Sequence, residues 1–333
     1  MTEVFEAGNA NDAWIKAVKC FSNQDLITIE DSRLGKTREI LHANFCIHDP
    51  RQRWVLSRLP AINPAFAIVE TFWILNGQND SKLINHWNPI LPKFMGKGLT
   101  YPGAYGYRIM KQFGFDQLNR AYNILMNNPK SRQVILQIWD PRQDLPHSNG
   151  TPTSEDIPCN ICAMPKIRSG RLEWLQVMRS NDLYRGTPYN IVQFTTLQEI
   201  LAGWLGVELG SYHQISDCLH IYENDLTELD YDQSLQQPQN VDKISIEKPQ
   251  FHVILKIIID RLYKLASSNL NISDFYRILD DTPLPSPYKN LLTIASCDSA
   301  RRRGWIDEQA YALGQCQNDL LSLAMTRWIA RKG

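Results

Sequence analysis

Seven cysteines are the first residues whose type and spacing could support chemistry. Cys159 and Cys162 form a CxxC pair, but no second pair has a spacing suited to zinc. The segment IPCNICAMPKI is predicted to be a strand, on which positions three apart face opposite sides, so the two thiols would not converge. Cys162 is therefore interpreted as a small buried apolar residue. Cys159 follows a proline at the strand start and precedes the polar Asn160, which makes it a candidate nucleophile.

The segment RSNDLYRGTPYN, residues 179–190, gathers several groups that could hold a nucleotide. Arg179 could bind a phosphate through its forked guanidinium, with Ser180 as an additional donor. Asn190 offers a donor and an acceptor that match a base edge. The alternative is a capped turn in which Asp182 and Asn190 are local turn formers, and spacing alone favours this alternative.

Two further segments carry isolated polar groups. His220 and Tyr222 of HIYENDL lie on one side of a predicted strand, where they suit sugar hydroxyls, although a lone histidine is more often structural. Glu70 lies in PAFAIVETFWILNG, an apolar segment predicted to be a helix from Pro64 to Gly77. A carboxyl in apolar surroundings has a raised pKa, which suits acid–base work. The alternative for Glu70 is a surface acid.

The elements that must position these residues follow a recognisable order. Helices are predicted at 10–22, 64–77, 114–127 and from Asn190 onward, and strands at 131–141 and 157–179, the latter as a hairpin. DSRLGKTREIL is predicted to be a polar loop. The pattern indicates an α+β fold with one mixed sheet and long helices. We expect residues 1–245 to form the catalytic domain and residues 246–333 a helical C-terminal extension.

Composition limits the classes of function. Lys and Arg total 35, as do Asp and Glu, so the formal charge is zero. A net charge of zero argues against a protein that binds nucleic acid or membranes, since a basic excess would supply that affinity. No apolar run approaches the roughly 20 residues of a membrane span. The N-terminal residues lack an apolar signal core. An odd number of dispersed cysteines favours reduced thiols and a cytoplasmic protein.

The joint order of these motifs resembles the thymidylate synthase superfamily, which includes the pyrimidine nucleotide hydroxymethylases. The motifs are Pro-Cys on a strand, then RSND, then Gly-Thr-Pro-Tyr-Asn opening a helix, then HIY. DSRLGKTREI, ETFWILNG, AYGYR and SRQ precede them in the expected order. The resemblance covers about residues 30–226.

The resemblance implies a role for each matching residue. Cys159 would add to C6 of a pyrimidine nucleoside monophosphate, and C5 would take a one-carbon unit from 5,10-methylenetetrahydrofolate. Glu70 and Tyr105 would manage protons through ordered water, and Asp182 with Gly186 would lie beside the folate. No metal is implied.

The remaining matches concern the nucleotide. Arg179 and Ser180 match the phosphate-binding pair, and Arg33 matches a mobile phosphate-binding arginine. Arg132 matches an arginine that reaches the neighbouring subunit's phosphate, which implies a homodimer. Asn190 would read the base, and an amide there favours uracil. His220 and Tyr222 match the pair that binds the ribose.

Departures from the family pattern leave the product open. Asn160 replaces the usual histidine, Gln133 a second arginine, and Arg185 an apolar residue, and the family's C-terminal tail has no visible counterpart. Closure of the site decides whether hydride or water reaches the new carbon. The leading hypothesis is therefore C5 one-carbon transfer to dUMP. The alternatives are a hydroxymethylase of dCMP, CMP or dUMP, and a degenerate nucleotide-binding or scaffold protein without turnover.

Overall fold

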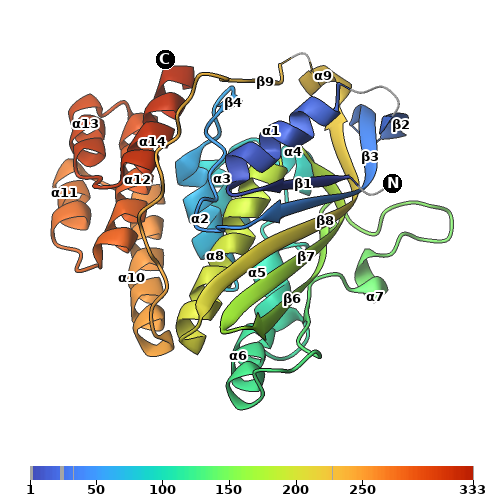
Figure 1. Cartoon of the computed structure of the whole chain (residues 1–333). Helices are drawn as coiled ribbons and strands as arrows, with labels where there is room; N and C mark the ends of the chain where they lie inside the picture. The colour runs from blue at the N-terminus through green and yellow to red at the C-terminus, as the bar shows by residue number, and fades with distance from the viewer. Residues whose placement is uncertain (1–2, 23–25, 33, 227, 333) are drawn as a thin grey trace.

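A mixed sheet with strand order β1-β3-β8-β7-β6-β5 forms one side of the molecule, with β2 paired to β3. The computed structural model describes residues 3–22, 26–32, 34–226 and 228–332. Figure 1 shows the sheet beside α2 and α8, with the C-terminal helices on the opposite side of α2. The strands are β1 Val4–Ala7, β2 Thr28–Ser32, β3 Gly35–Ile47, β5 Leu136–Gln137, β6 Asn160–Arg168, β7 Arg171–Asp182 and β8 Glu208–Tyr222. The α+β prediction is confirmed.

The sheet mixes both strand orientations. β1 and β3 are parallel, as are β7 and β8, whereas the pairs β2–β3, β3–β8, β6–β7 and β5–β6 are antiparallel. The predicted hairpin at 157–179 is present as β6 and β7. Its turn is made by Ser169 and Gly170, with φ of 50° and 75°, a left-handed pair that matches the twist of the two strands. A small second sheet pairs β4 Arg58–Leu59 with β9 Asp230–Tyr231.

α8 packs on the inner face of the sheet, and α2 packs on α8. α2 Pro64–Leu75 starts at Asn63, whose side chain accepts the Phe66 amide hydrogen, and all its residues are buried except Glu70, which is half-buried. α8 Thr187–Leu205 is buried on almost every side, as expected of a helix between a sheet and a second helical layer. The remaining helices of this part are α1 Ala10–Cys20, α3 Ser81–Trp87, α4 Pro92–Met95, α5 Tyr105–Tyr107, a π-helical turn Arg108–Gln112, α6 Gln117–Asn127, α7 Pro141–Asp144 and α9 Glu223–Leu226.

Two local predictions are wrong. DSRLGKTREIL is not a polar loop but part of the β2–β3 hairpin, in which Ser32 is paired with Gly35. β2 is exposed on both faces, so it carries no apolar alternation that would reveal it. The predicted strand 131–141 is reduced to Leu136–Gln137. The Gln117 side chain accepts from the Gln137 backbone N–H at 2.7 Å and donates to its carbonyl at 2.9 Å, which occupies the backbone groups that another strand would need.

Five helices follow residue 246: α10 Lys248–Ala266, α11 Ile272–Asp280, α12 Ser286–Arg303, α13 Ile306–Gly314 and α14 Asp319–Lys332. α10, α12 and α14 pack against α2. The described chain after residue 246 is therefore mainly helical. A boundary between two domains at residue 245 stays a prediction. No helix of the described residues is long and apolar enough to cross a membrane.

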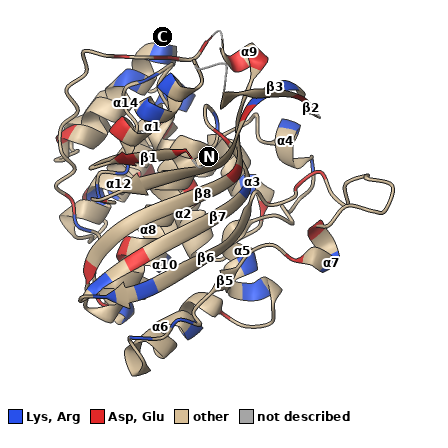
Figure 2. Cartoon of the chain, turned by 45° about the vertical axis from the view of Figure 1, so that its right-hand side comes forward, with Lys and Arg blue, Asp and Glu red and all other residues tan. Residues whose placement is uncertain are grey.

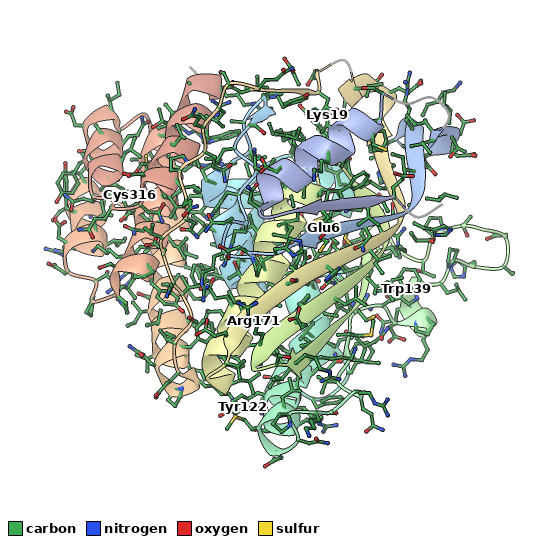
Figure 3. All side chains as sticks on the ribbon, viewed as in Figure 1. Glu6, Lys19, Tyr122, Trp139, Arg171 and Cys316 are labelled. Atoms are coloured by element: carbon green, nitrogen blue, oxygen red, sulfur yellow. The ribbon has the colours of Figure 1, made fainter. Side chains whose placement is uncertain are left out.

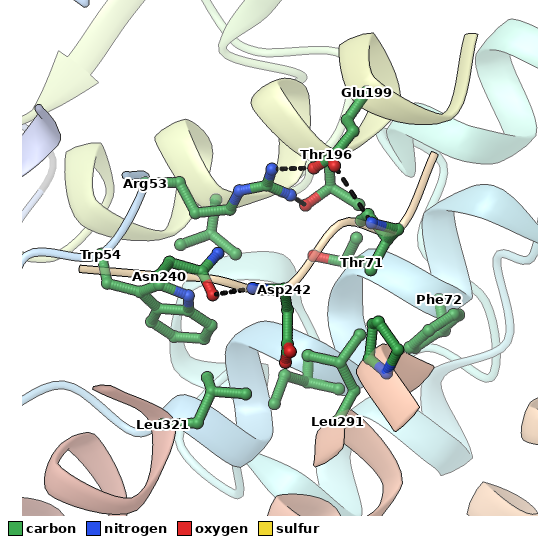
Figure 4. Close-up of a pocket in the computed structure, with 14 residues that line it drawn as sticks. Arg53, Trp54, Thr71, Phe72, Thr196, Glu199, Asn240, Asp242, Leu291 and Leu321 are labelled. Carbon is green, nitrogen blue, oxygen red and sulfur yellow. Dashed lines mark hydrogen bonds and ion pairs between the residues drawn. The ribbon is translucent and has the colours of Figure 1, made fainter. Parts of the chain in front are cut away.

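A buried ion pair lies where these helices meet the rest of the chain (Figure 4). Glu199 of α8 is fully buried and accepts from the Arg53 guanidinium, which also donates to Thr196 at 2.7 Å. The second Glu199 oxygen accepts the Ile244 amide hydrogen at 3.0 Å. Gly203 lets the next residues of the same segment pass close to α8, because a Cβ there would lie 2.5 Å from the Ile246 nitrogen. One carboxylate thus joins residues 53, 199 and 244.

Glu199→Leu is expected to lower the free energy of unfolding by about 3–5 kcal/mol, because it leaves the buried Arg53 charge without its partner. Urea denaturation followed by far-UV circular dichroism measures the loss. Lys264→Gln is the control, since Lys264 and Asp260 form an exposed pair expected to be worth less than about 1 kcal/mol. Equal effects of the two substitutions would contradict the assignment.

Candidate active site

A cavity of about 1030 Å³ opens at the ends of β7 and β8, slightly above the roughly 300–1,000 Å³ of most small-molecule sites. Ten of the twelve residues predicted from the sequence line it. They are Glu70, Tyr105, Cys159, Arg179, Ser180, Asp182, Gly186, Asn190, His220 and Tyr222. The sheet, α2, α8 and the segment before β6 therefore bring residues about 150 positions apart to one space.

Cys159 lies directly before β6 and is only partly buried. Arg179 holds this segment from β7: its backbone N–H donates to the Cys159 carbonyl at 2.9 Å. Its guanidinium donates to the carbonyls of Pro158 at 3.0 Å and Ile157 at 3.1 Å, and lies 5.5 Å from the Trp139 ring. Figure 3 labels Trp139 on the chain just before α7. All these partners are neutral, so the Arg179 charge remains able to attract an anion close to the thiol.

The cavity wall formed by β7 and β8 carries hydroxyl, imidazole and phenol groups. Ser180 and His220 hydrogen-bond through Oγ and Nδ1 at 3.3 Å. The His220 and Tyr222 rings lie 5.5 Å apart, edge to face. Strand register brings Asp182 opposite His220. The predicted ribose-side pair and the predicted phosphate-side serine are therefore neighbours.

For Asp182 and Asn190 the sequence left two roles open, that of a local turn former and that of a ligand-binding group. One Asp182 oxygen accepts the backbone N–H groups of Tyr184 at 2.8 Å and Arg185 at 2.7 Å, which makes it a turn former. Burial raises its pKa. Asn190 lies in the first turn of α8 and donates to Asn181 at 3.3 Å. Both side chains nevertheless line the cavity.

The Glu70 carboxyl in the cavity has a strongly shifted pKa. Burial raises its pKa to about 8, although a hydrogen bond from Gln193 at 2.5 Å opposes the shift. The other amide atom of Gln193, Oε1, is buried without a hydrogen-bond partner among the described residues. A protonated Glu70 at neutral pH can donate a hydrogen bond or a proton.

Tyr105 reaches the same region because α5 touches α2. Gly106 makes this approach possible, since a Cβ there would lie 2.0 Å from the Ile74 carbonyl oxygen. Burial raises the pKa of Tyr105 far above its usual value, and the Cys159 and Glu70 charges add to the effect. The phenol therefore lies near both groups and stays protonated.

One predicted residue among those that the structure describes does not join the cavity. Arg132 is exposed and lies outside the cavity lining. Arg33 lies outside the described residues. Cys162 also lies outside the lining, and a β-bulge separates it from Asn160.

Sequence reasoning missed several lining residues. Asp156 accepts the Gly103 backbone N–H at 2.6 Å, and burial raises its pKa to about 6. Asp144 forms a buried bidentate pair with Arg108, at 2.8 and 2.9 Å. Arg108, the partner of Asp144, belongs to the motif AYGYR, so the sequence did offer a signal for this ion pair. Arg301, Arg302, Trp328 and Arg331 of the C-terminal helices also line the cavity, and no motif indicated them.

A thiol, an arginine–serine pair, a helix-opening amide and a His–Tyr pair around one cavity define a nucleotide-sized pocket with a potential cysteine nucleophile. The sequence model described as thymidylate synthase matches residues 31–276. The chain belongs to the thymidylate synthase family.

Curated relatives have modest identity. The deoxyuridylate hydroxymethyltransferase of Bacillus phage SP01 is 32% identical over 60% of this chain and 54% of its own length. That of Pseudomonas phage M6 is 36% identical over 50% and 47%. A putative thymidylate synthase of Methanothermobacter marburgensis is 32% identical over 64% of this chain and 89% of that protein. The chain thus spans about half the length of the phage relatives.

Glu70→Gln is expected to change how stability depends on pH. A carboxyl whose pKa rises from 4.5 to about 8 on folding contributes stability that is fully present below pH 4.5 and lost as pH rises through 8. Glutamine stays neutral at every pH. The free energy of unfolding of the variant should therefore rise relative to that of the wild type between pH 5 and 9, by a few kcal/mol in order of magnitude. Urea midpoints across this range measure the gain, with the exposed Glu208→Gln as control. A constant difference between variant and wild type would show that Glu70 does not titrate with a raised pKa.

Proposed function

We propose that the protein transfers a one-carbon unit to C5 of deoxyuridylate through a covalent adduct between Cys159 and C6. The single observation that carries the proposal is the meeting of Cys159, Arg179 and Asn190 in one cavity. In that arrangement a thiol, a phosphate-binding cation and a base-reading amide can contact one nucleotide.

The chain's own residues account for the first chemical step. The Cys159 thiolate forms a bond to C6, and the electron pair of the C5=C6 bond moves toward C5 and O4. The Asn190 amide can donate to O4 and accept from N3–H, a pattern that uracil offers. Glu70, protonated at neutral pH, stabilises negative charge at O4 directly or through water. C5 would then use this electron pair to bond the one-carbon unit. Loss of the C5 proton to water and cleavage of the S–C6 bond then restore the C5=C6 bond and release Cys159 as the thiolate.

Arg179 and Ser180 hold the phosphate, and His220 with Tyr222 hold the deoxyribose. Arg33 serves as a further phosphate ligand. Arg179 also favours the thiolate, because a nearby cation lowers the free energy of an anionic sulfur. Its guanidinium keeps this charge, since its partners are neutral carbonyls.

The donor set fits 5,10-methylenetetrahydrofolate as cofactor. Trp87 lines the cavity with a buried indole N–H that has no hydrogen-bond partner among the described residues. Asp182 and Gly186 line the cavity and would hold the cofactor's ring. When bound, the cofactor supplies a one-carbon unit at the oxidation level of formaldehyde.

The new carbon has two possible fates. Hydride transfer yields 5-methyl product and dihydrofolate, whereas addition of water yields 5-hydroxymethyl product and tetrahydrofolate. The second outcome is supported by the names of the two phage relatives. Incubation of dUMP and methylenetetrahydrofolate with the protein, followed by mass spectrometry, distinguishes the two products, and parallel reactions with dCMP and CMP test the base and the sugar.

Cys159→Ser is expected to reduce tritium release from [5-³H]dUMP by at least about 10³-fold, because the nucleophile is lost. Cys162→Ser is the matched control, since this thiol lies three residues away and outside the cavity. Tritium release by the wild type that survives in Cys159→Ser would contradict the adduct. A wild type that releases no tritium from any pyrimidine nucleotide would instead favour a binding protein without turnover.

The active unit is proposed to be a homodimer. The outer face of the sheet carries Met164, Leu175, Val177 and Ile215, which strand pairing makes neighbours. Figure 2 shows long uncharged stretches along β6, β7 and β8, with charged residues toward one end of these strands. A half-exposed apolar face of this kind suits an isologous contact with a second copy. The exposed Arg132 then serves the partner's phosphate site.

Mixing Arg132→Ala with Cys159→Ser tests this sharing. Each variant alone should be inactive, but a mixed dimer keeps one site that has both groups. Random exchange of subunits should therefore restore about one quarter of wild-type turnover. Mixing each variant with itself is the control, and turnover that stays at the level of the separate variants would contradict an arginine shared across the dimer.

A further inference from the structure

The cavity wall opposite the sheet comes from helices outside the family match, which ends at residue 276. Arg301 and Arg302 lie in the last turn of α12, and Trp328 and Arg331 near the end of α14. α12 and α14 both pack on α2, which carries Glu70. These residues therefore face the space that the proposed cofactor would occupy, yet belong to no motif of the family.

One buried carboxylate fixes the orientation of this wall. Asp298 has no exposed surface and accepts from the Nε atoms of Arg301 at 2.8 Å and Arg302 at 2.7 Å. The Trp328 indole donates to it at 3.1 Å. Burial alone would raise the pKa of Asp298, but the two guanidinium groups hold it below its usual value. Asp298 is therefore ionised, and it neutralises one of the two arginine charges.

Two further arginines add to the positive charge. Arg331 donates to the Ala61 carbonyl at 2.8 Å. Arg58, which is 5% exposed, donates to the carbonyls of Tyr184 and Pro60. Burial lowers the pKa of Arg58, and the Arg331 charge contributes to that shift, so the two guanidinium groups are close. These hydrogen bonds end on neutral carbonyls and leave both charges uncompensated by them.

Indole rings lie between the charges. Arg302 lies 5.8 Å from the Trp87 ring, and Arg301 and Arg331 lie 5.8 and 5.3 Å from the Trp328 ring. Trp87 is 1% exposed, and its N–H has no hydrogen-bond partner among the described residues. A buried donor without a partner is costly, so this side of the cavity suits a ligand that brings an acceptor and a carboxylate next to an aromatic ring.

We infer that the ends of α12 and α14 bind the acidic tail of the cofactor, with Arg302 and Arg331 as ligands of its glutamate carboxylates. The inference rests on the proposed function and adds to it a subsite made by residues beyond the family match. A second source of the same anionic chemistry is the phosphate of the nucleotide. If the arginines bind the glutamate tail, changing them should weaken the binding of the folate. If they bind the phosphate, changing them should weaken the binding of the nucleotide.

Calorimetric titration of the full chain, saturated with dUMP, tests the inference without turnover. Tetrahydrofolate is compared with tetrahydropteroate, which has the same rings but lacks the glutamate. The wild type should prefer tetrahydrofolate by at least about 10-fold, the gain expected of charge-assisted hydrogen bonds to carboxylates. In Arg302→Gln/Arg331→Gln the preference should fall toward unity while the affinity for tetrahydropteroate stays the same.

Matched variants separate charge from folding. Arg302→Lys/Arg331→Lys keeps the charges and should retain part of the preference. Arg327→Gln on the same helix is the control, because Arg327 pairs with Asp232 at 3.1 Å and lies outside the cavity. The inference would be overturned if the double glutamine variant kept the preference for tetrahydrofolate over tetrahydropteroate. It would also be overturned if that variant lost affinity for dUMP and not for the glutamate part of the folate. A wild type that binds neither folate would instead contradict the proposed function.

Discussion

The buried carboxylate of Glu199 is the interaction on which the arrangement of the chain depends. A fully buried charge persists only with close compensation, and here the compensation comes from parts of the sequence that are far apart. Arg53 supplies the counter-charge and the Ile244 backbone N–H supplies a donor. α8 is thereby fixed against the segment that precedes α2 and against the segment that leads to the C-terminal helices. The position of α8 in turn sets Asn190 at the cavity.

The C-terminal helices make further hydrogen bonds to the segment that contains Ile244. Tyr288 donates to the Ile244 carbonyl, Asn290 to Asp242 at 2.9 Å, and Asn318 to Asn240 at 2.9 Å. These bonds fix α12 and the residue before α14 to the segment 240–244, while both helices pack against α2, and the arginines at the helix ends line the cavity. The C-terminal helices are therefore part of the cavity wall, and their position depends on contacts around a second, small cavity of about 40 Å³, which is lined by Asn240, Asp242 and Ile244 (Figure 4).

Much of the fold was open to prediction from the sequence because its helices and its hairpin carry local signals. α2 has Asn63 and Pro64 at its start, and the β6–β7 turn has Gly170. The β2–β3 hairpin was missed because an exposed ribbon needs no apolar alternation. The strand at 131–141 was overestimated because β-branched residues there fill the core, while the Gln117 side chain takes the hydrogen bonds of Gln137.

For the site, the sequence by itself determined the chemical groups: the Cys159 thiol, the Arg179–Ser180 pair, the Asn190 amide and the His220–Tyr222 pair follow from motif order. Only the tertiary structure decided their environment, because burial and charge depend on neighbours distant in the chain. It made Glu70 a carboxyl with a pKa of about 8 beside Gln193. It also brought Arg302 and Trp328, which follow Cys159 by 143 and 169 positions, to the same cavity through packing that no local pattern encodes.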